Sequence, residues 1–373
     1  MKKPYDLVIV GAGFFGAVCA YELKRKGFRC LMIEKRRHIG GNCYTDSKDG
    51  INIHQYGAHI FHTSNLKIWE WVNQFATFNH YCHRLRANHA GRIFSFPINL
   101  KTFQQLWGVS TSAAARERLE SVKIPSAGID SLEDWALSQV GREVYELFIK
   151  GYSEKQWGRP AADLPASIIR RLPVRFTDDD RYFDDTYQGI PEGGYTPIFH
   201  KLLAGTEVRL NRDYLANRSY FESLGRRVLY TGPIDCFFDY RFGYLDYRGL
   251  RFELERVECA DYQGMAVMNF TSAQVPQTRI IEHKHFEFGR QPVTWITREY
   301  PLVASGTEEP FYPIKDQRNQ RIFEQYKEWS RQLKQYHFGG RLAEYQYFDM
   351  HQVIGSALQK CRDIEGDLRQ IKD

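Results

Sequence analysis

The fold is decided by the stretch Tyr5-Asp6-Leu7-Val8-Ile9-Val10-Gly11-Ala12-Gly13-Phe14-Phe15-Gly16 near the start of the chain. Its apolar run predicts a buried parallel strand that leads directly into a Gly-x-Gly-x-x-Gly loop. A helix is expected over residues 14–26, ending at Gly27, and a second strand over residues 29–33. This order indicates a βαβ dinucleotide-binding unit and an α/β, Rossmann-like fold.

Each part of such a unit has a physical role here. Gly11 permits the tight turn, Gly13 lets the backbone approach a pyrophosphate, and Gly16 lets the helix pack on the strand. The N-terminus of the helix offers free N–H groups to the phosphates. Glu34, which closes the second strand, can accept hydrogen bonds from the adenosine ribose. The alternative, a glycine-rich turn without a ligand, leaves the acid at this distance unexplained.

Both NAD and FAD bind such a unit, and the residues after Glu34 favour FAD. Lys35-Arg36-Arg37-His38-Ile39-Gly40-Gly41-Asn42 places a second glycine pair just past the acid, as in glutathione-reductase-like flavoproteins, although an ordinary surface turn is the alternative. The expected FAD contacts in this region are Gly11, Gly13, Phe14, Gly16, Glu34, Lys35, Gly41 and Asn42.

The C-terminal region has the pattern of a second flavin-binding element. Residues 337–341 (His-Phe-Gly-Gly-Arg) are expected to end a strand, and residues 349–358 are expected to form a helix with Asp349 as its N-cap. In this class of flavoproteins a late strand and helix are directed at the isoalloxazine ring. A plain terminal helix packed on the sheet would explain the periodicity but not the preceding Gly-Gly-Arg.

Composition limits the remaining possibilities. A chain of 373 residues suggests two or three domains. The net charge of +6 comes without a dense Lys/Arg run, which argues against nucleic acid as a partner and favours an acidic small substrate. Seven scattered cysteines without a Cys-x-x-Cys pair predict a reduced, cytoplasmic protein. No apolar run has membrane-spanning length, and Asp6 interrupts the only signal-like stretch, so no stable membrane insertion is expected.

The patterns along the chain predict a discontinuous domain organisation. Ser131 with Asp134 is typical of a helix start, whereas residues 251–257 alternate as in a half-exposed antiparallel strand. We expect an FAD-binding domain from residues 1–76, 190–236 and 335–373, with a helical insertion over 97–169. An antiparallel sheet domain for the substrate is expected from residues 77–96, 170–189 and 237–334.

Further motifs rich in aromatic residues and arginine are more specific than the glycine loop. They are residues 57–63 (GAHIFHT), 151–158 (GYSEKQWG), 170–176 (RRLPVRF), 279–286 (RIIEHKHF), 309–313 (EPFYP) and 340–351 (GRLAEYQYFDMH). Taken together, the set closely resembles the bacterial UDP-galactopyranose mutase family, and the resemblance covers nearly the whole chain.

The resemblance implies an isomerase that uses reduced FAD without net redox change. Such an enzyme interconverts UDP-galactopyranose and UDP-galactofuranose through a covalent flavin–sugar adduct and supplies galactofuranose for cell-surface polysaccharide. Bacterial members are usually homodimers. The resemblance further implies Arg171, Arg279 and His59 as catalytic residues, with the two arginines holding the diphosphate.

The remaining site residues are also implied by the resemblance. The substrate contacts would be His83, Tyr152, Ser153, Trp157, Arg171, Tyr182, Asn269, Arg279, Tyr312, Tyr347 and Asp349, and the further FAD contacts His59, Ile60, Arg341 and Met350. Elementary chemistry agrees, because guanidinium groups offer paired donors to a diphosphate and a uracil ring stacks on an aromatic surface. Taken singly, Trp157 could be a core residue and Arg171 a surface ion-pair residue.

Departures from the family pattern bear on the sugar rather than on the cofactor. The family commonly has Asn where this chain has His83, and tyrosines are frequent where it has Phe311 and Phe348. A mutase acting on a related UDP-sugar, a flavin oxidoreductase of the same fold and a non-catalytic nucleotide-sugar-binding protein stay open. His59-x-x-His62 could bind zinc, but the Cys or carboxylate ligands that usually accompany such a pair are missing, so no metal is expected.

Overall fold

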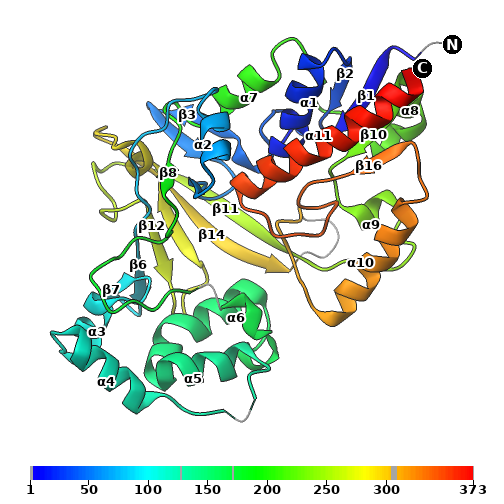
Figure 1. Ribbon diagram of the computed structural model, residues 1–373. Coiled ribbons are helices and arrows are strands. Elements are labelled where there is room, and N and C mark those ends of the chain that lie inside the picture. The colour runs from blue at the N-terminus through cyan, green and yellow to red at the C-terminus, as the bar shows by residue number, and fades with distance from the viewer. Residues whose placement is uncertain (1–2, 127, 170–171, 304–308, 373) are drawn as a thin grey trace.

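The computed structural model describes residues 3–126, 128–169, 172–303 and 309–372 (Figure 1). Within these residues the strands form one five-stranded sheet, one seven-stranded sheet and two small two-stranded sheets. The five-stranded sheet, called the Rossmann sheet below, is entirely parallel. Its order is β16 (Tyr336–Phe338), β10 (Gly225–Tyr230), β1 (Tyr5–Val10), β2 (Cys30–Ile33) and β9 (Glu207–Arg209).

The predicted βαβ unit is confirmed, with β1 and β2 flanking α1 (Phe14–Arg25). Leu7 and Ile9 of β1 face a core shared with α1, α7 (Thr196–Leu202) and α11 (Met350–Lys372), while Val8 faces the opposite core. That second core includes η5 (Leu215–Asn217), α8 (Arg218–Leu224) and α9 (Ile234–Phe237). Helices therefore cover both faces of the sheet, which explains why residues 7–10 of β1 and all of β2 are apolar.

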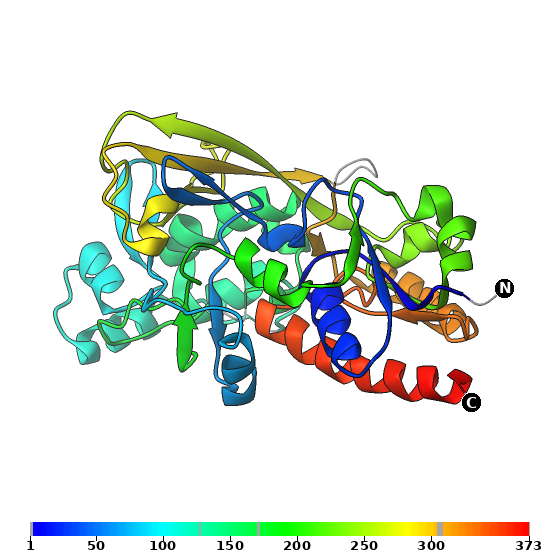
Figure 2. The ribbon, with the colours of Figure 1, turned by 90° about the horizontal axis from the view of Figure 1, so that it is seen from above.

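A seven-stranded sheet, called the central sheet below, adjoins the Rossmann sheet. Its order is β15 (Tyr312–Pro313), β11 (Tyr247–Val257), β14 (Thr294–Val303), β13 (Arg279–Glu282), β12 (Val267–Phe270), β6 (Leu85–His89) and β7 (Arg92–Phe96). The expected antiparallel pairing holds with one exception, because β12 and β6 run parallel. Figure 2 shows the long strands β11 and β14 on one side of the molecule and α11 on the other.

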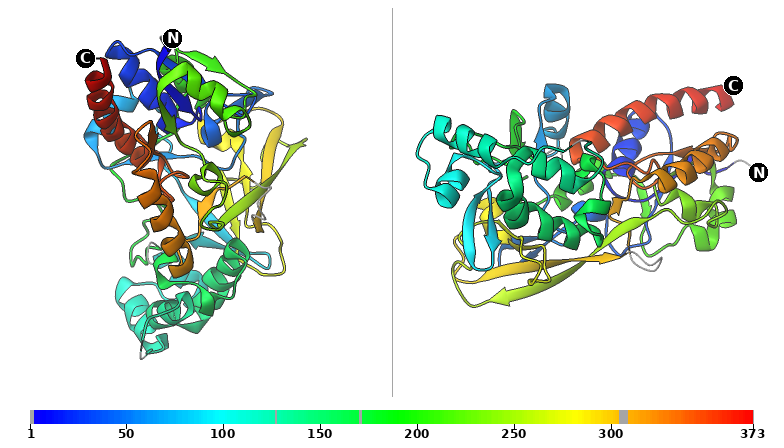
Figure 3. Two further views of the ribbon diagram at one scale, coloured as in Figure 1. Left: turned by 90° about the vertical axis from the view of Figure 1, so that its right-hand side faces the viewer. Right: turned by 90° about the horizontal axis from the view of Figure 1, so that it is seen from below.

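The region expected to be helical is helical and lies at the far end of the molecule from the Rossmann sheet (Figure 3). Ser131 caps its central helix as predicted: its hydroxyl accepts from Asp134 N–H at 3.0 Å. The elements are α3 (Leu100–Trp107), α4 (Ser112–Val122), α5 (Leu132–Val144), the π-helix η2 (Tyr145–Lys150), α6 (Gly151–Trp157), η3 (Ala161–Asp163) and η4 (Ala166–Ile168).

Short elements connect these parts. One small sheet joins β3 (Thr45–Lys48) to β4 (Ile51–His54), and the other joins β5 (Phe61–Thr63) to β8 (Tyr187–Gly189). β8 lies in a segment expected in the substrate domain, yet it pairs with β5 of the dinucleotide-binding part, a long-range pairing that local patterns cannot reveal. The other helices are η1 (Gly41–Cys43), α2 (Leu66–Val72), η6 (His283–Glu287) and α10 (Gln317–Ser330). None of the described helices is both long and apolar enough to cross a membrane.

Candidate active site

The glycine loop forms a cradle of bare backbone in which Gly11, Gly16 and Gly41 leave no room for a side chain. A Cβ on Gly16 would lie 2.1 Å from Gly11 O, and one on Gly11 would lie 2.2 Å from the Thr231 hydroxyl. Gly13 and Gly41 face each other, since a Cβ on Gly41 would lie 2.9 Å from Gly13 Cα. Gly11 and Gly41 also have positive φ angles of 102° and 55°. The backbone of these glycines thus lies uncovered beside the N-terminus of α1, and this is the arrangement that binds a pyrophosphate.

Glu34 lies at the end of β2 and is almost completely buried. Its carboxylate accepts from Ala12 N–H and from Arg36 N–H, both at 2.8 Å. Each carboxylate oxygen keeps a further lone pair, so the group can still accept from a ribose hydroxyl. Arg36 in turn donates to Asn42 Oδ1 at 2.9 Å and forms an ion pair with Glu309. The residues present therefore fit an adenine dinucleotide.

The other predicted cofactor residues differ in what they offer. The side chain of Phe14 points into the core, with its ring 4.6 Å from that of Phe199, so only its backbone at the start of α1 remains available. The amine of Lys35 lies 3.6 Å from Glu309 and is mainly exposed. Ile60 is buried, and Met350 begins α11 beside the first core.

Arg341 belongs to the turn after β16, as expected. Its guanidinium lies 5.1 Å from the ring of Tyr347 and donates to the carbonyl of Phe348. It is also close enough to His59 to contribute, after burial, to lowering the pKa of that histidine to about 4. The turn after β16, which was predicted to face the flavin, therefore lies close to residues 57–59.

The central sheet presents a polar row on one face. Asn269 of β12, Arg279 of β13 and Glu299 of β14 are directly paired neighbours, so their side chains project to the same side. Arg279 Nε lies 3.3 Å from Glu299 Oε1, and the guanidinium donates to the hydroxyl of Tyr152 on α6. The buried Asn269 Oδ1 in the row has no hydrogen-bond partner among the described residues. Such an atom indicates a polar ligand.

Tyrosines from separate segments surround Arg279. Tyr312 of β15 stacks on Tyr347, with ring centroids 5.5 Å apart. Tyr152 and Tyr312 are both close enough to Arg279 to help Glu299 raise the pKa of its guanidinium. Burial raises the pKa of Tyr182 to about 12, and it raises the pKa of Tyr312 as well. These hydroxyls therefore stay protonated and can donate to an anionic ligand near neutral pH.

His83 is buried and lies beside Tyr81 and the more exposed Tyr182. The backbone N–H of Tyr182 donates to His83 O at 2.8 Å, and the two rings meet edge to face with centroids 5.4 Å apart. The Tyr81 hydroxyl lies 3.1 Å from His83 Nδ1. Burial, with a smaller effect from Arg279, lowers the pKa of His83 to about 3, so the side chain is neutral.

Three further predicted substrate residues lie on the elements that frame the row. Ser153 is buried within α6, and Trp157 at the end of α6 is partly buried against the core of the helical part. Asp349 lies immediately before α11, and its backbone N–H donates to Gln352 Oε1 at 2.9 Å. Arg171 lies outside the described residues.

Glu299 is a site residue that the sequence reasoning missed. It is 2% exposed and holds the one ion pair that Arg279 makes among the described residues. The strand alternation in Thr297-Arg298-Glu299 could have placed it on the buried face. Its pairing with β13 could not be seen, because that register depends on tertiary structure.

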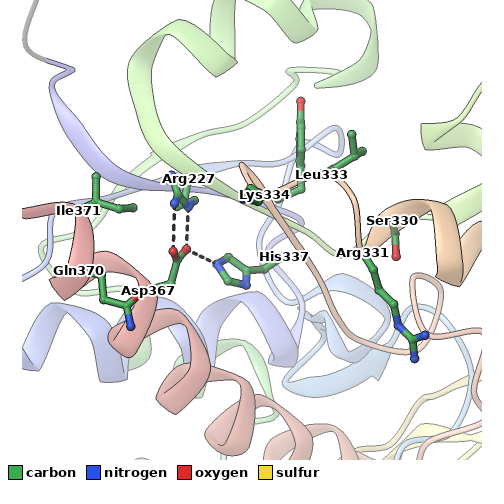
Figure 4. A pocket seen from close by; sticks show the side chains of 10 residues that line it. Arg227, Ser330, Arg331, Leu333, Lys334, His337, Asp367, Gln370 and Ile371 are labelled. Carbon is green, nitrogen blue, oxygen red and sulfur yellow. Dashed lines mark hydrogen bonds and ion pairs between the residues drawn. The ribbon is translucent and has the colours of Figure 1, made fainter.

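Two other features are separate from this site. A cavity of about 450 Å³ lies between β10, β16 and the end of α11. Asp367 in its lining binds Arg227 and His337 (Figure 4). Asp261, Glu282 and His285 have a metal-capable arrangement, but the Glu282 carboxylate already accepts from the backbone N–H groups of Tyr262 and Gln263. No predicted site residue belongs to either group.

Comparison with known proteins decides between the flavoenzyme classes that this geometry allows. A family model described as UDP-galactopyranose mutase matches residues 147–347, which contain the polar row and all four tyrosines. The chain belongs to this family. A model of the NAD(P)-binding Rossmann-like domain also matches residues 9–75. Membership of the mutase family, a family of isomerases, implies a flavin in the cradle.

Individual mutases are similar over nearly their full length. A dTDP-fucopyranose mutase of Escherichia coli is 39% identical, with 95% of this chain and 96% of the relative covered. A probable UDP-galactopyranose mutase of Klebsiella pneumoniae is also 39% identical, with 95% and 93% covered. A solved structure of reduced UDP-galactopyranose mutase shares the fold, with a TM-score of 0.70, 13% identity and coverage of 97% and 94%. A putrescine oxidase structure has a TM-score of 0.58 at 13% identity, with 97% and 99% covered.

Three buried histidines, His54, His83 and His283, and the partly buried His59 lead to a first prediction, on acid stability. Burial lowers the pKa values of His59 to about 4 and of His83 and His283 to about 3, and it lowers that of His54. Because these groups bind protons more readily when unfolded, their contribution to stability is complete above pH 6.5. It is lost as the pH falls toward 4, by about 1.4 kcal/mol per pH unit for each such histidine.

Urea unfolding of the protein at pH 7.5, 6 and 5 measures this loss. His283→Asn should flatten the pH dependence, whereas His80→Asn, at an exposed histidine, should leave it unchanged. A free energy of unfolding that stays constant from pH 7.5 to pH 5 would show that the buried histidines are protonated without cost.

Proposed function

We propose that this chain interconverts UDP-galactopyranose and UDP-galactofuranose without net redox change. The observation that carries the proposal is the polar row. Arg279 is a charged group with its partner Glu299, among tyrosine hydroxyls from separate segments, next to an amide oxygen without a partner among the described residues. A nucleoside diphosphate supplies both negative oxygens for the guanidinium and donors for the amide. The cofactor proposed for the cradle is FAD in its reduced form.

The residues of the row would act on the diphosphate. Arg279 and the hydroxyls of Tyr182, Tyr312 and Tyr347 would bind its oxygens, with Arg171 as the second guanidinium. Negative charge grows on the diphosphate when the sugar–phosphate bond breaks, so donors fixed in advance stabilise that state most. When bound, reduced FAD would supply the nucleophile for the anomeric carbon. Neutral His59, close to Arg341, would line the cofactor side of the site.

The nucleoside end is proposed for α6. Tyr152 holds one side of Arg279, and Trp157 closes the same helix five residues later, so the two aromatic rings belong to one rigid element. Lys155 fixes that helix to the central sheet, because its amine donates to the carbonyls of Phe270, Val275 and Gln277 at 2.7–3.0 Å. A uracil ring would stack on Tyr152. We also propose a cytoplasmic homodimer that supplies galactofuranose for surface polysaccharide.

A second substrate is favoured by one observation. The dTDP-fucopyranose mutase of Escherichia coli is as similar to this chain, at 39% identity, as the probable UDP-galactopyranose mutase of Klebsiella pneumoniae. The same diphosphate chemistry serves both substrates, which differ in the base, in the 2′-hydroxyl of the nucleoside and in the hydroxyl on carbon six of the transferred sugar. dTDP-fucopyranose is therefore the alternative substrate.

The proposal is tested by liquid chromatography of UDP-galactofuranose incubated with dithionite-reduced protein. We expect UDP-galactopyranose to form with reduced protein and to form much more slowly with fully oxidised protein. dTDP-fucofuranose is run in parallel, and the larger kcat/KM identifies the substrate. Equal turnover by oxidised protein, or consumption of oxygen in proportion to the sugar converted, would contradict the non-redox isomerisation.

A further inference from the structure

We propose that His54 is a positioning residue that holds the turn at residues 57–59 and thereby fixes which ring nitrogen of His59 carries the proton. The inference rests on the placement of His59 in the proposed active site. His54 is the last residue of β4, is 1% exposed and lies too deep to contact substrate. It acts through the backbone of His59.

The hydrogen bonds around His54 have only one consistent set of directions. The backbone N–H of His59 donates to His54 Nδ1 at 3.1 Å, so Nδ1 must be unprotonated and the proton of the neutral ring must be on Nε2. The backbone N–H of His54 likewise donates to His283 Nδ1 at 3.2 Å. His283 therefore carries its proton on Nε2, from which it donates to the hydroxyl of Thr297 at 2.7 Å.

The turn held in this way determines the state of His59. Within it, His59 Nδ1 lies 2.8 Å from Gly57 O, and a carbonyl can only accept, so Nδ1 carries the proton. His59 Nε2 is then the bare nitrogen, and it makes no hydrogen bond to any described residue. It is the nitrogen left to accept a hydrogen bond or a proton from a ligand in the site. A second tether comes from Tyr195, whose hydroxyl donates to His59 O at 3.1 Å.

The cost of a histidine at position 54 shows that the ring does more than pack against its neighbours. Its protonated Nε2 is buried without a partner among the described residues, while its ring stacks on Phe286 with centroids 4.5 Å apart. A phenylalanine would keep the stacking and avoid the unsatisfied N–H. What phenylalanine lacks is the acceptor for His59 N–H. The histidine is thus explained by the hydrogen bond to the turn.

Two variants separate the acceptor from the ring. His54→Asn keeps an acceptor oxygen near the place of Nδ1 but loses the stacked ring, whereas His54→Phe keeps the ring and loses the acceptor. The tautomer of His59 is read from ¹⁵N-histidine NMR spectra of the oxidised holoenzyme, with the His59 signal assigned from His59→Gln. This readout does not depend on turnover, so it distinguishes a failure of this inference from a failure of the proposed function.

We expect wild type and His54→Asn to show His59 in the single form protonated on Nδ1. His54→Phe should show a second form and at least a tenfold lower kcat with KM changed less than twofold. The inference is overturned if His59 keeps its Nδ1 proton in His54→Phe, or if His54→Asn is impaired as much as His54→Phe. Should His54→Phe fail to fold, Tyr195→Phe decides, because loss of that tether must also produce the second form of His59.

Discussion

Replacing Arg279 by alanine is expected to lower turnover by about 10²–10³-fold or more while the protein keeps its flavin. The guanidinium lies on the central sheet, away from the glycine cradle, and it is the positive charge that the described part of the site directs at the ligand. Two measurements check this: kcat of the reduced enzyme, and the change in flavin absorbance when UDP is added to the oxidised enzyme.

Matched variants separate charge from stability in this prediction. Removal of Arg279 leaves the buried carboxylate of Glu299 without its ion-pair partner and should lower the free energy of unfolding. The double variant Arg279→Ala/Glu299→Gln should recover that free energy but not turnover. Arg298→Ala is the control. Arg298 precedes Glu299 in β14, so its side chain projects from the opposite face of the sheet, where it pairs with Glu255. Near-normal turnover in Arg279→Ala would remove this residue from the site.

Gly13→Ala is expected to fold normally but to lose flavin. Gly13 has a φ angle of −77°, which any residue can adopt. A methyl group added there would have Gly41 Cα as its nearest neighbour, at 3.8 Å, so the protein has room for the side chain. The methyl group would occupy the space through which the backbone approaches a pyrophosphate. We expect a flavin dissociation constant raised at least about tenfold, which corresponds to about 1.4 kcal/mol. Flavin content after gel filtration measures the effect.

The control for this substitution is Gly366→Ala on α11, where an added methyl group meets open space. It should leave both the flavin content and the fold unchanged. Gly16→Ala differs from both, because its methyl group would collide with the carbonyl of Gly11 and should destabilise the protein itself. Full flavin occupancy in Gly13→Ala would mean that the pyrophosphate does not approach the loop at this glycine.

Local patterns predicted the elements whose environment is set by nearby residues. The run from Tyr5 to Gly16 contains a strand, a turn and the start of a helix within one segment. Ser131 likewise has its capping partner, Asp134, only three residues further along the chain. Long-range pairings could not be predicted in the same way. The parallel junction of β12 with β6 and the pairing of β5 with β8 join segments far apart in the sequence.

The same distinction applies to the site. Arg279, Tyr152, Tyr312 and Tyr347 were predicted because they lie in motifs that carry the family resemblance, and Asn269 and Tyr182 because the resemblance implies them. The sequence reasoning missed the roles of three residues whose partners only the fold brings together. Glu299 pairs with Arg279. His54 accepts a hydrogen bond from the backbone of His59, and His283 accepts one from the backbone of His54. The domain boundaries and the roles of single site residues stay predictions until variants are measured.

The central claim is that a flavin lies beside a pocket in which Arg279 helps to bind a nucleotide diphosphate. The most direct test is the titration of purified, oxidised wild-type protein with UDP, followed by flavin absorbance. We predict a yellow protein whose flavin spectrum changes saturably with UDP and does not change in Arg279→Ala. A folded protein that is colourless and cannot be reconstituted with FAD, or a flavin spectrum indifferent to UDP, would contradict the account.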